Sequence, residues 1–323
     1  MHMMKEIKRD GKKPLVILTG PTSVGKTSLS IRLAHEIGGE IISADSMQVY
    51  RGMDIGTAKI TAEEMDGIPH YLVDILDPDQ PFNVVEFQKM AKEAMTRIYS
   101  HEKIPVLVGG TGFYIQALLY DIDFSEHPEE ENYRRELTQL AEEKGKQYLH
   151  SMLEEVDPEY AASVHYHNVK KVIRALEDHK ETGRKLSAHN REQQERTSPY
   201  QCAYLVLNQD RGILYDRINQ RVDQMMEQGL LQEVRQLSER GYTPDLVSMQ
   251  GLGYKEFFDY FDGNLPLDEV VDRIKMETRR FAKRQLTWFR REKDVIWINK
   301  GDYPGEEEIL TAILEHLRQK GIL

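Results

Sequence analysis

The segment from Gly20 to Thr27 has the sequence Gly-Pro-Thr-Ser-Val-Gly-Lys-Thr, which completes the pattern G-x-x-x-x-G-K-[ST]. The apolar run 15–18 before it predicts a buried strand, and apolar residues after it recur at helical spacing. A strand must therefore turn into a helix through a loop that contains glycine. Such a loop directs successive backbone N–H groups, and the positive end of the helix dipole, toward anionic oxygens. The sequence therefore predicts that the chain holds a phosphate group.

Every position of this loop belongs to the predicted phosphate-binding set. Lys26 is expected to reach the terminal phosphate, and the Thr27 hydroxyl is expected to ligate Mg²⁺. The loop alone does not say which phosphate compound is bound. The set comprises Gly20, Pro21, Thr22, Ser23, Val24, Gly25, Lys26 and Thr27.

The first 120 residues alternate strand-like and helical runs, which is typical of an α/β fold with a mostly parallel sheet. Asn83 is a good N-cap for the second helix. With the phosphate-binding loop, the pattern predicts a core like that of the P-loop NTPases. The expected strands are 15–19, 40–44, 71–76 and 104–108, and the expected helices are 26–37 and 84–101.

From about residue 124 the composition becomes charged and helical, with two or three amphipathic segments before about residue 198. A strand signal returns at 203–208, followed by long helical patterns at 211–240 and 266–292 and a last strand at 295–299. This order predicts a discontinuous core of residues 1–122 plus 199–323. A helical insertion domain, 123–198, interrupts it.

Bulk composition excludes several classes of protein. No apolar run approaches the roughly 20 residues that span a bilayer, and the start of the chain is polar, so we expect a cytoplasmic protein without a secretory signal. The single cysteine, Cys202, excludes an internal disulfide framework and a multi-cysteine metal site. A monomer without an obligate protein partner is the default expectation.

Polar segments follow two further strands. Asp45 to Gln48 come after strand 40–44, and Gly109 to Gly112 after strand 104–108. Ligands of open α/β sheets lie at these carboxyl ends. Asp45 is equally consistent with a proton acceptor and with a turn cap. The Gly-Gly-Thr-Gly run is equally consistent with an anion-binding nest and with a plain turn.

An acidic residue that organises Mg²⁺ and an attacking water is expected at the end of a later strand in ATPases and GTPases. Gly109 and Gly110 stand at the most strand-like candidate position. This weakens the motor and switch hypotheses, and leaves a kinase-like transferase or an enzyme with a different phosphate donor.

A basic stripe lies near the C-terminus of this acidic chain, whose net charge is -11. Nine Lys or Arg residues fall between Arg273 and Lys293, against two acids. Like charges four residues apart destabilise a helix unless an anion compensates them. An RNA backbone is the favoured anion, although a solvated helix face with an apolar stripe remains the alternative.

Several blocks together resemble the bacterial tRNA dimethylallyltransferase family, from about residue 14 to residue 292. The block from Asp45 to Lys59 is the most specific, and all blocks occur in the order of the family. Besides the phosphate-binding loop and that block, they are 69–74, 109–114, 253–256 and 282–290.

The resemblance implies transfer of a dimethylallyl group from dimethylallyl diphosphate to N6 of the adenosine 3′ of the anticodon in tRNA, with release of pyrophosphate. The loop would then hold a diphosphate leaving group, with Mg²⁺ as cofactor. Asp45 is expected to accept the N6 proton, and Thr111 to contact the target nucleotide or Asp45. Lys26 and Arg217 are expected at the pyrophosphate, with Arg221 as the alternative to Arg217.

The stretches that match the family's RNA-contacting motifs supply the expected tRNA contacts, and the insertion domain is expected to bind the anticodon stem-loop. The residues are Asp45, Ser46, Met47, Gln48, Thr111, Lys170, Lys171, Arg174, Gly253, Tyr254, Lys255, Thr278, Arg279, Arg280, Lys283, Arg284 and Gln285.

Three other functions share part of this pattern. An adenylate prenyltransferase has the loop and the Asp45 block but takes a free nucleotide, which needs neither the insertion nor the basic stripe. A small-molecule kinase would use ATP in the same loop. An RNA-binding module with a vestigial loop would not need Asp45.

Overall fold

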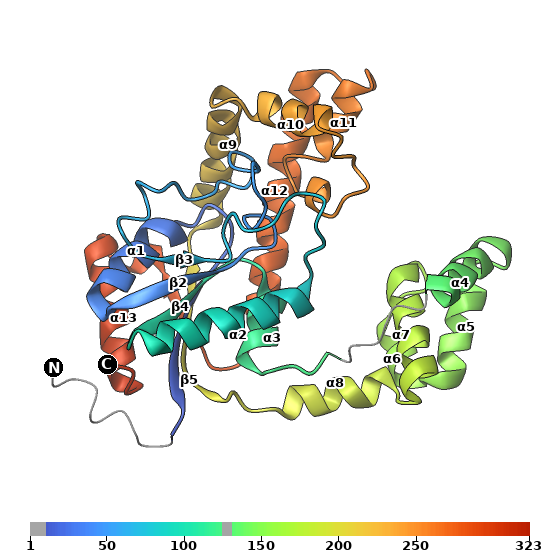
Figure 1. Cartoon of the computed structure of the whole chain (residues 1–323), viewed down its shortest axis with the longest axis horizontal. Coiled ribbons are helices and arrows are strands. Elements are labelled where there is room, and N and C mark those ends of the chain that lie inside the picture. The colour runs from blue at the N-terminus through green and yellow to red at the C-terminus, as the bar shows by residue number, and fades with distance from the viewer. Residues whose placement is uncertain (1–10, 125–130) are drawn as a thin grey trace. The chain divides into compact units, whose positions relative to one another are not determined.

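A single parallel sheet forms the centre of the core. The computed structural model describes residues 11–124 and 131–323, so the first ten residues and the start of the insertion lie outside it. The sheet has the order β3-β2-β4-β1-β5-β6, and every neighbouring pair is parallel (Figure 1). The strands are β1 (Lys13–Thr19), β2 (Gly39–Ala44), β3 (His70–Tyr71), β4 (Ile104–Gly109), β5 (Tyr200–Asn208) and β6 (Val295–Asn299).

Helices cover both faces of this sheet, which confirms the predicted α/β class. Alternate residues of the central strands, such as Val16 and Leu18, pack with α1 (Lys26–Ile37) and α13 (Glu306–Gln319). The opposite side carries α2 (Val84–Ser100) and α3 (Gly112–Leu119) (Figure 1). Strands buried on both faces read as continuous apolar runs, as 15–18 does.

Local sequence explains several element boundaries. The Asn83 side chain accepts hydrogen bonds from the N–H groups of Val85 and Glu86, so it caps α2 as predicted. Asp210 caps α9 (Arg211–Glu227) in the same way. Gly38 ends α1 in the left-handed conformation that glycine adopts without strain.

Two predicted elements were wrong in extent. The expected strand 71–76 pairs only at His70 and Tyr71, because Leu72 and Asp74 adopt left-handed φ values of 63° and 61°. The expected helix 211–240 is interrupted at Gly229, whose φ is 102°. It consists of α9 and α10 (Leu230–Glu239).

Long helices extend the core beyond the sheet. α9 packs against α12 (Leu267–Phe289), α10 packs on α9, and the short α11 (Glu256–Phe261) packs on α12 (Figure 1). The 3₁₀ turns η1 (Ser248–Gln250) and η2 (Lys300–Asp302) complete this part.

The insertion is a separate helical unit of residues 122–197, and the core unit comprises 1–121 and 198–323. Its own apolar core includes Leu149, Leu153 and Val172. The described part holds five helices rather than two or three amphipathic segments. They are α4 (Glu131–Glu143), α5 (Lys146–Val156), α6 (Pro158–Ser163), α7 (Val169–Thr182) and α8 (Leu186–Glu195).

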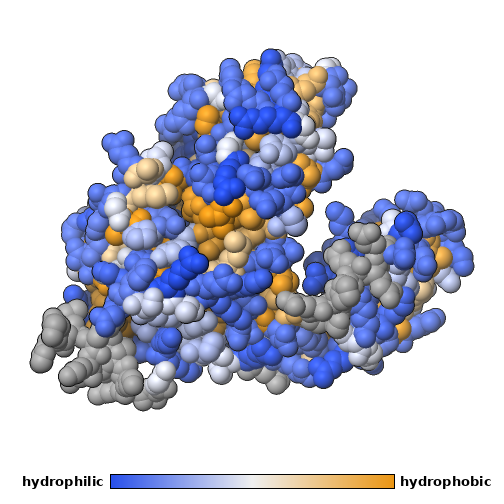
Figure 2. All heavy atoms as spheres, viewed as in Figure 1, coloured by the Kyte–Doolittle hydropathy of each residue, from blue (hydrophilic) through white to orange (hydrophobic). Residues whose placement is uncertain are grey.

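Hydrophilic residues cover most of the face shown in Figure 2, with hydrophobic residues gathered in the middle of the core unit. Among the described residues, none of the helices has the length and apolar character needed to cross a membrane.

Candidate active site at the carboxyl ends of the strands

The phosphate-binding loop joins β1 to α1 as predicted. Gly20 has a φ of 147°, and a Cβ there would stand 2.5 Å from the carbonyl oxygen of Leu207, so only glycine fits. Gly25 precedes α1 in a left-handed conformation, without a side-chain cap on the first turn. Uncapped N–H groups at a helix N-terminus are suited to binding an anion.

The first half of the loop is less available to a phosphate than the motif suggests. Pro21 has no N–H, and the Thr22 N–H donates to Oε1 of Gln285 at 2.9 Å. The second half contains an unsatisfied donor instead. The Ser23 hydroxyl is buried without a hydrogen-bond partner among the described residues. A phosphate oxygen would satisfy it.

The Lys26 ammonium folds back across its own loop, where it donates to the carbonyl oxygens of Gly20 at 3.0 Å and Pro21 at 2.9 Å. Burial lowers its pKa from 10.5 to about 8, and the charge of Arg221 lowers it further, while Asp45 acts in the opposite direction. The amine therefore lies in a site that lacks compensating negative charge. A diphosphate would supply that charge.

Asp45 forms a tight turn immediately after β2. Its Oδ1 accepts from the N–H groups of Met47 at 2.8 Å and Gln48 at 3.2 Å. The turn-cap interpretation is therefore correct as geometry. The same carboxylate also acts electrostatically on Lys26 and Arg221, so it faces the phosphate-binding loop as topology predicted.

The glycines after β4 serve close packing. None of Gly109, Gly110 and Gly112 has a positive φ. A Cβ on Gly109 would stand 2.2 Å from the carbonyl oxygen of Ala44, and one on Gly112 would stand 2.3 Å from the Trp288 ring. The glycines thus let the loop approach β2 and α12, and Thr111 is held beside Asp45's strand because its N–H donates to Ala44.

Gln285 of α12 joins two of these loops. Its Oε1 accepts from Thr22, and its Nε2 donates to the carbonyl oxygen of Gly110 at 2.9 Å. Only 6% of the residue is exposed. Its amide is thus fully engaged inside the protein, and the expected tRNA contact does not fit this position.

Two arginines of α9 flank the loop at different places. Arg221 is the one coupled to Lys26 and Asp45, and burial lowers its pKa, with Asp45 opposing. Arg217 is exposed and acts on Lys300, whose Nζ donates to the carbonyl oxygen of Val24 at 3.3 Å. Lys300 was not predicted, because nothing in the sequence around it marks a phosphate site.

The basic stripe separates into two parts. In the first part Arg273 pairs with Asp259, Lys275 with Asp223 and Arg280 with Glu277, and Arg279 donates to Asn219. These side chains stabilise contacts between helices. The second part opens onto a cleft of ≈ 390 Å³, lined by Arg280, Lys283, Arg284, Thr287, Trp288 and Arg291.

The other expected tRNA contacts differ in accessibility. Gly253 and Tyr254 are buried, so the structure corrects their assignment, and the Thr278 hydroxyl donates to the carbonyl oxygen of Ile274. Lys255 is exposed, and so are Lys170, Lys171 and Arg174 on α7. Ser46, Met47 and Gln48 are partly exposed.

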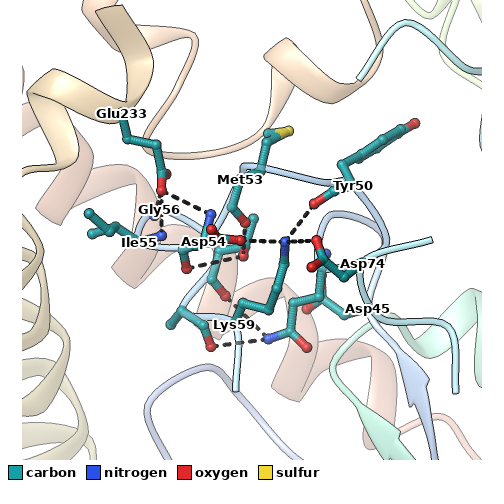
Figure 3. A network of polar contacts seen from close by, with 12 residues as sticks. Asp45, Tyr50, Met53, Asp54, Ile55, Gly56, Lys59, Asp74 and Glu233 are labelled. Atoms are coloured by element: carbon teal, nitrogen blue, oxygen red, sulfur yellow. Dashed lines mark hydrogen bonds and ion pairs between the residues drawn. The ribbon is translucent and has the colours of Figure 1, made fainter. Parts of the chain in front are cut away.

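A second polar network holds the segment that follows Asp45 (Figure 3). Lys59 donates to the carbonyl oxygen of Tyr50 and to the carboxylates of Asp54 and Asp74, all within 2.7 Å. Only 6% of its side chain is exposed. The sequence marked this block as specific but gave no signal for the partners of Lys59.

Thr27 lies at the start of α1 with its side chain exposed, where it can ligate a cation. The described residues contain no group of three or more His, Cys, Asp or Glu side chains suited to a metal. Mg²⁺ commonly takes one or two protein ligands and completes its shell with phosphate oxygens and water. The residues present fit a metal that arrives with a diphosphate.

Comparisons with known proteins agree on one family. A family model described as IPP transferase matches residues 48–292, and one described as isopentenyl transferase matches residues 13–75. A tRNA dimethylallyltransferase from Lachnoclostridium phytofermentans is 58% identical over 311 residues, covering 96% of this chain and 99% of the relative. One from Halalkalibacterium halodurans is 48% identical over 93% of this chain and 95% of its own length.

Solved structures show the same fold. The full-length tRNA isopentenylpyrophosphate transferase from Bacillus halodurans superimposes with a TM-score of 0.73 at 47% identity, covering 96% of this chain and 98% of its own. A eukaryotic dimethylallyltransferase acting on tRNA gives a TM-score of 0.76 at 31% identity, over 89% of this chain and 74% of its own.

Proposed function

The chain belongs to the tRNA dimethylallyltransferase family, and we propose that it transfers a dimethylallyl group from dimethylallyl diphosphate to N6 of the adenosine 3′ of the anticodon in tRNA. One observation carries this assignment within the site. The phosphate-binding loop and the Asp45 carboxylate meet at one edge of the sheet, with Lys26 and Arg221 between them.

The loop would bind the leaving group. The Ser23 hydroxyl and the N–H groups at the start of α1 would donate to diphosphate oxygens, and Lys26 would leave the carbonyl oxygens of Gly20 and Pro21 for the phosphate. Arg217 and Arg221 stand on two sides of the loop to share the charge that develops as the allylic C–O bond breaks. Mg²⁺ held at Thr27 would neutralise part of that charge.

Asp45 would serve as the proton acceptor. The N6 lone pair forms the new C–N bond to the allylic carbon, the C–O electron pair leaves with pyrophosphate, and the N6 proton passes to the carboxylate. Thr111 follows β4, next to the strand that carries Asp45, where it can contact the target nucleotide. No water has to be positioned for attack on phosphorus, which agrees with glycines at the end of β4.

The tRNA would be held by exposed cations. Lys283, Arg284 and Arg291 around the cleft on α12 would meet backbone phosphates, and Trp288 gives that cleft an aromatic wall. Backbone contacts of this kind would offset the few kcal/mol needed to flip the adenosine out of its stack. The exposed Lys170, Lys171 and Arg174 would contribute from the insertion. We include in the proposal that the enzyme acts as a cytoplasmic monomer.

The test is nucleoside analysis of unmodified tRNA after incubation with the protein, Mg²⁺ and labelled dimethylallyl diphosphate. We expect label on one adenosine next to the anticodon, and none when EDTA is added. Parallel reactions contain free AMP, or ATP with a hydroxyl acceptor. Label on AMP alone would show an adenylate prenyltransferase, and release of ADP without prenylation would show a kinase.

A further inference from the structure

Glu233 on α10 receives four hydrogen bonds through one carboxylate. Its Oε2 accepts from the N–H groups of Asp54 at 2.9 Å and Ile55 at 2.8 Å, and its Oε1 accepts from the N–H of Gly56 at 3.1 Å (Figure 3). The Tyr254 hydroxyl donates to the same Oε1 at 2.6 Å. Three consecutive amides converge here as they would on a bound anion.

The surroundings of this carboxylate are built to keep it in place. Tyr254 is fully buried, and burial together with the neighbouring Glu233 raises its pKa well above the ordinary value, so its hydroxyl remains a donor. Gly56 packs against the Tyr254 ring so closely that a Cβ would stand 2.5 Å from it. Residues 54–56 therefore have one defined position relative to α10.

The same segment is bonded to the turn that carries Asp45. Nε2 of Gln48 donates to the carbonyl oxygens of Thr57 at 3.2 Å and Ala58 at 3.3 Å, directly after the three amides held by Glu233. The Gln48 N–H donates in turn to Oδ1 of Asp45. A continuous path of hydrogen bonds and backbone thus leads from Glu233 to the Asp45 carboxylate.

We propose that Glu233 is a positioning residue for the transfer reaction, which acts through residues 54–58 and Gln48 to fix the orientation of the Asp45 carboxylate. This inference rests on the proposed function, because it assigns Glu233 to the proton-transfer step. Lys59 holds the end of the segment through Asp54, Asp74 and the Tyr50 carbonyl oxygen. Glu233 holds its start and is the only link of the path that comes from α10.

The test replaces Glu233 with Gln. An amide has one acceptor oxygen, so its NH₂ group must face at least one of the backbone N–H donors, and the segment loses a defined position. We expect kcat to fall by about 10- to 100-fold, with KM for tRNA and for dimethylallyl diphosphate changed less than about twofold. Glu233→Asp, which keeps the charge, should recover part of the rate. The matched control is Glu239→Gln on the same helix, which should behave as wild type.

A double-mutant comparison separates positioning from general stabilisation. With Asp45→Asn already in place, Glu233→Gln should cause no further loss in single-turnover rate, since the group that it orients no longer accepts the proton. A purely structural role would lower the rate by the same factor in both backgrounds. Thermal unfolding of every variant checks that the comparison is made on folded protein.

The outcomes remain distinguishable from failure of the proposed function. An unchanged kcat in Glu233→Gln, or an equal loss in the Asp45→Asn background, would overturn the inference. Absence of prenyl transfer by the wild-type protein would overturn the proposed function instead. If Glu233→Gln does not fold, Tyr254→Phe removes one of the four donors, and its smaller loss should likewise disappear in the Asp45→Asn background.

Discussion

At the scale of single residues, Asp45 combines two roles that sequence patterns treat as alternatives. Its Oδ1 caps the turn at Met47 and Gln48, while its charge acts on Lys26 and Arg221. A carboxylate that is held by its own turn has few orientations left. Capping the turn is therefore part of preparing the proposed base.

This double role predicts different results for two substitutions. Asp45→Asn keeps an oxygen that can cap the turn but loses basicity, so we expect turnover at least about 100-fold lower with tRNA affinity within about twofold. Asp45→Ala should lose as much turnover and also about 1 kcal/mol of unfolding free energy, because two N–H groups lose their acceptor. Single-turnover rates, filter binding and thermal denaturation measure the three quantities. Asp45→Asn with more than a tenth of the wild-type rate would exclude the proposed base.

Lys26 predicts that diphosphate binding is linked to proton uptake. Burial, followed by Arg221, sets its pKa at about 8 in the free protein, and a bound diphosphate would raise this value. At pH 8 the wild type should therefore take up about half a proton more per pyrophosphate bound than Lys26→Met does. Calorimetry in buffers of different ionisation enthalpy measures this difference. Equal proton uptake by the two proteins would contradict the prediction.

The same shift has a sign for stability. A lysine whose pKa is lower in the folded state binds a proton more tightly when unfolded, so the free protein loses stability as pH falls from 10.5 through 8. We expect Lys26→Met to unfold at a higher temperature than wild type at pH 7. Saturating pyrophosphate should reduce or reverse that difference, because it stabilises the charged amine only in the wild type.

At the scale of elements, local patterns predicted what local interactions determine. The strands at 15–19, 40–44 and 104–108 and the caps of α2 follow from apolar runs and from Asn83. The strand expected at 71–76 failed because two left-handed residues, Leu72 and Asp74, turn the chain away after one pair. Nothing in an apolar run encodes that turn.

Contacts between distant elements were the main part that the sequence could not supply. Gln285 was placed with the tRNA contacts because it belongs to a basic block, yet the register of α12 directs its amide between two loops of the site. Glu233 looked like any acid on an amphipathic helix. Its role appears only when α10 is placed beside residues 54–56.

The division of the basic stripe predicts unequal effects of charge removal on α12. Lys283→Gln combined with Arg284→Gln should weaken tRNA binding about tenfold or more, and should lower the salt dependence of log Kd by about two charges' worth. The control is Arg273→Gln, whose ion pair with Asp259 holds α11 against α12. It should reduce stability but leave the salt slope unchanged. Equal salt slopes in all three proteins would show that the cleft does not meet RNA phosphates.

At the scale of the whole molecule, the active-site residues and the insertion belong to different units. Residues 198–323 return to the sheet after the insertion, and β5 pairs with β1 beside the phosphate-binding loop. The insertion has a separate apolar core and carries Lys170, Lys171 and Arg174 on α7. The core can therefore hold its geometry while the insertion contributes to tRNA binding alone.

This separation predicts that charges on α7 affect one substrate and not the other. Replacing Lys170, Lys171 and Arg174 with Gln should raise the Kd for tRNA by about tenfold or more, because three phosphate contacts are lost. Pyrophosphate affinity and its proton uptake should remain as in wild type, since no residue of the phosphate-binding loop is changed.

A matched variant controls for net charge. Lys144, Lys146 and Arg191 also belong to the insertion unit, and their replacement with Gln removes the same charge from other helices and helix ends. We expect this variant to lose much less tRNA affinity than the α7 variant. Similar losses in both would mean that the insertion acts through its overall charge, and no loss in either would confine tRNA binding to the core unit.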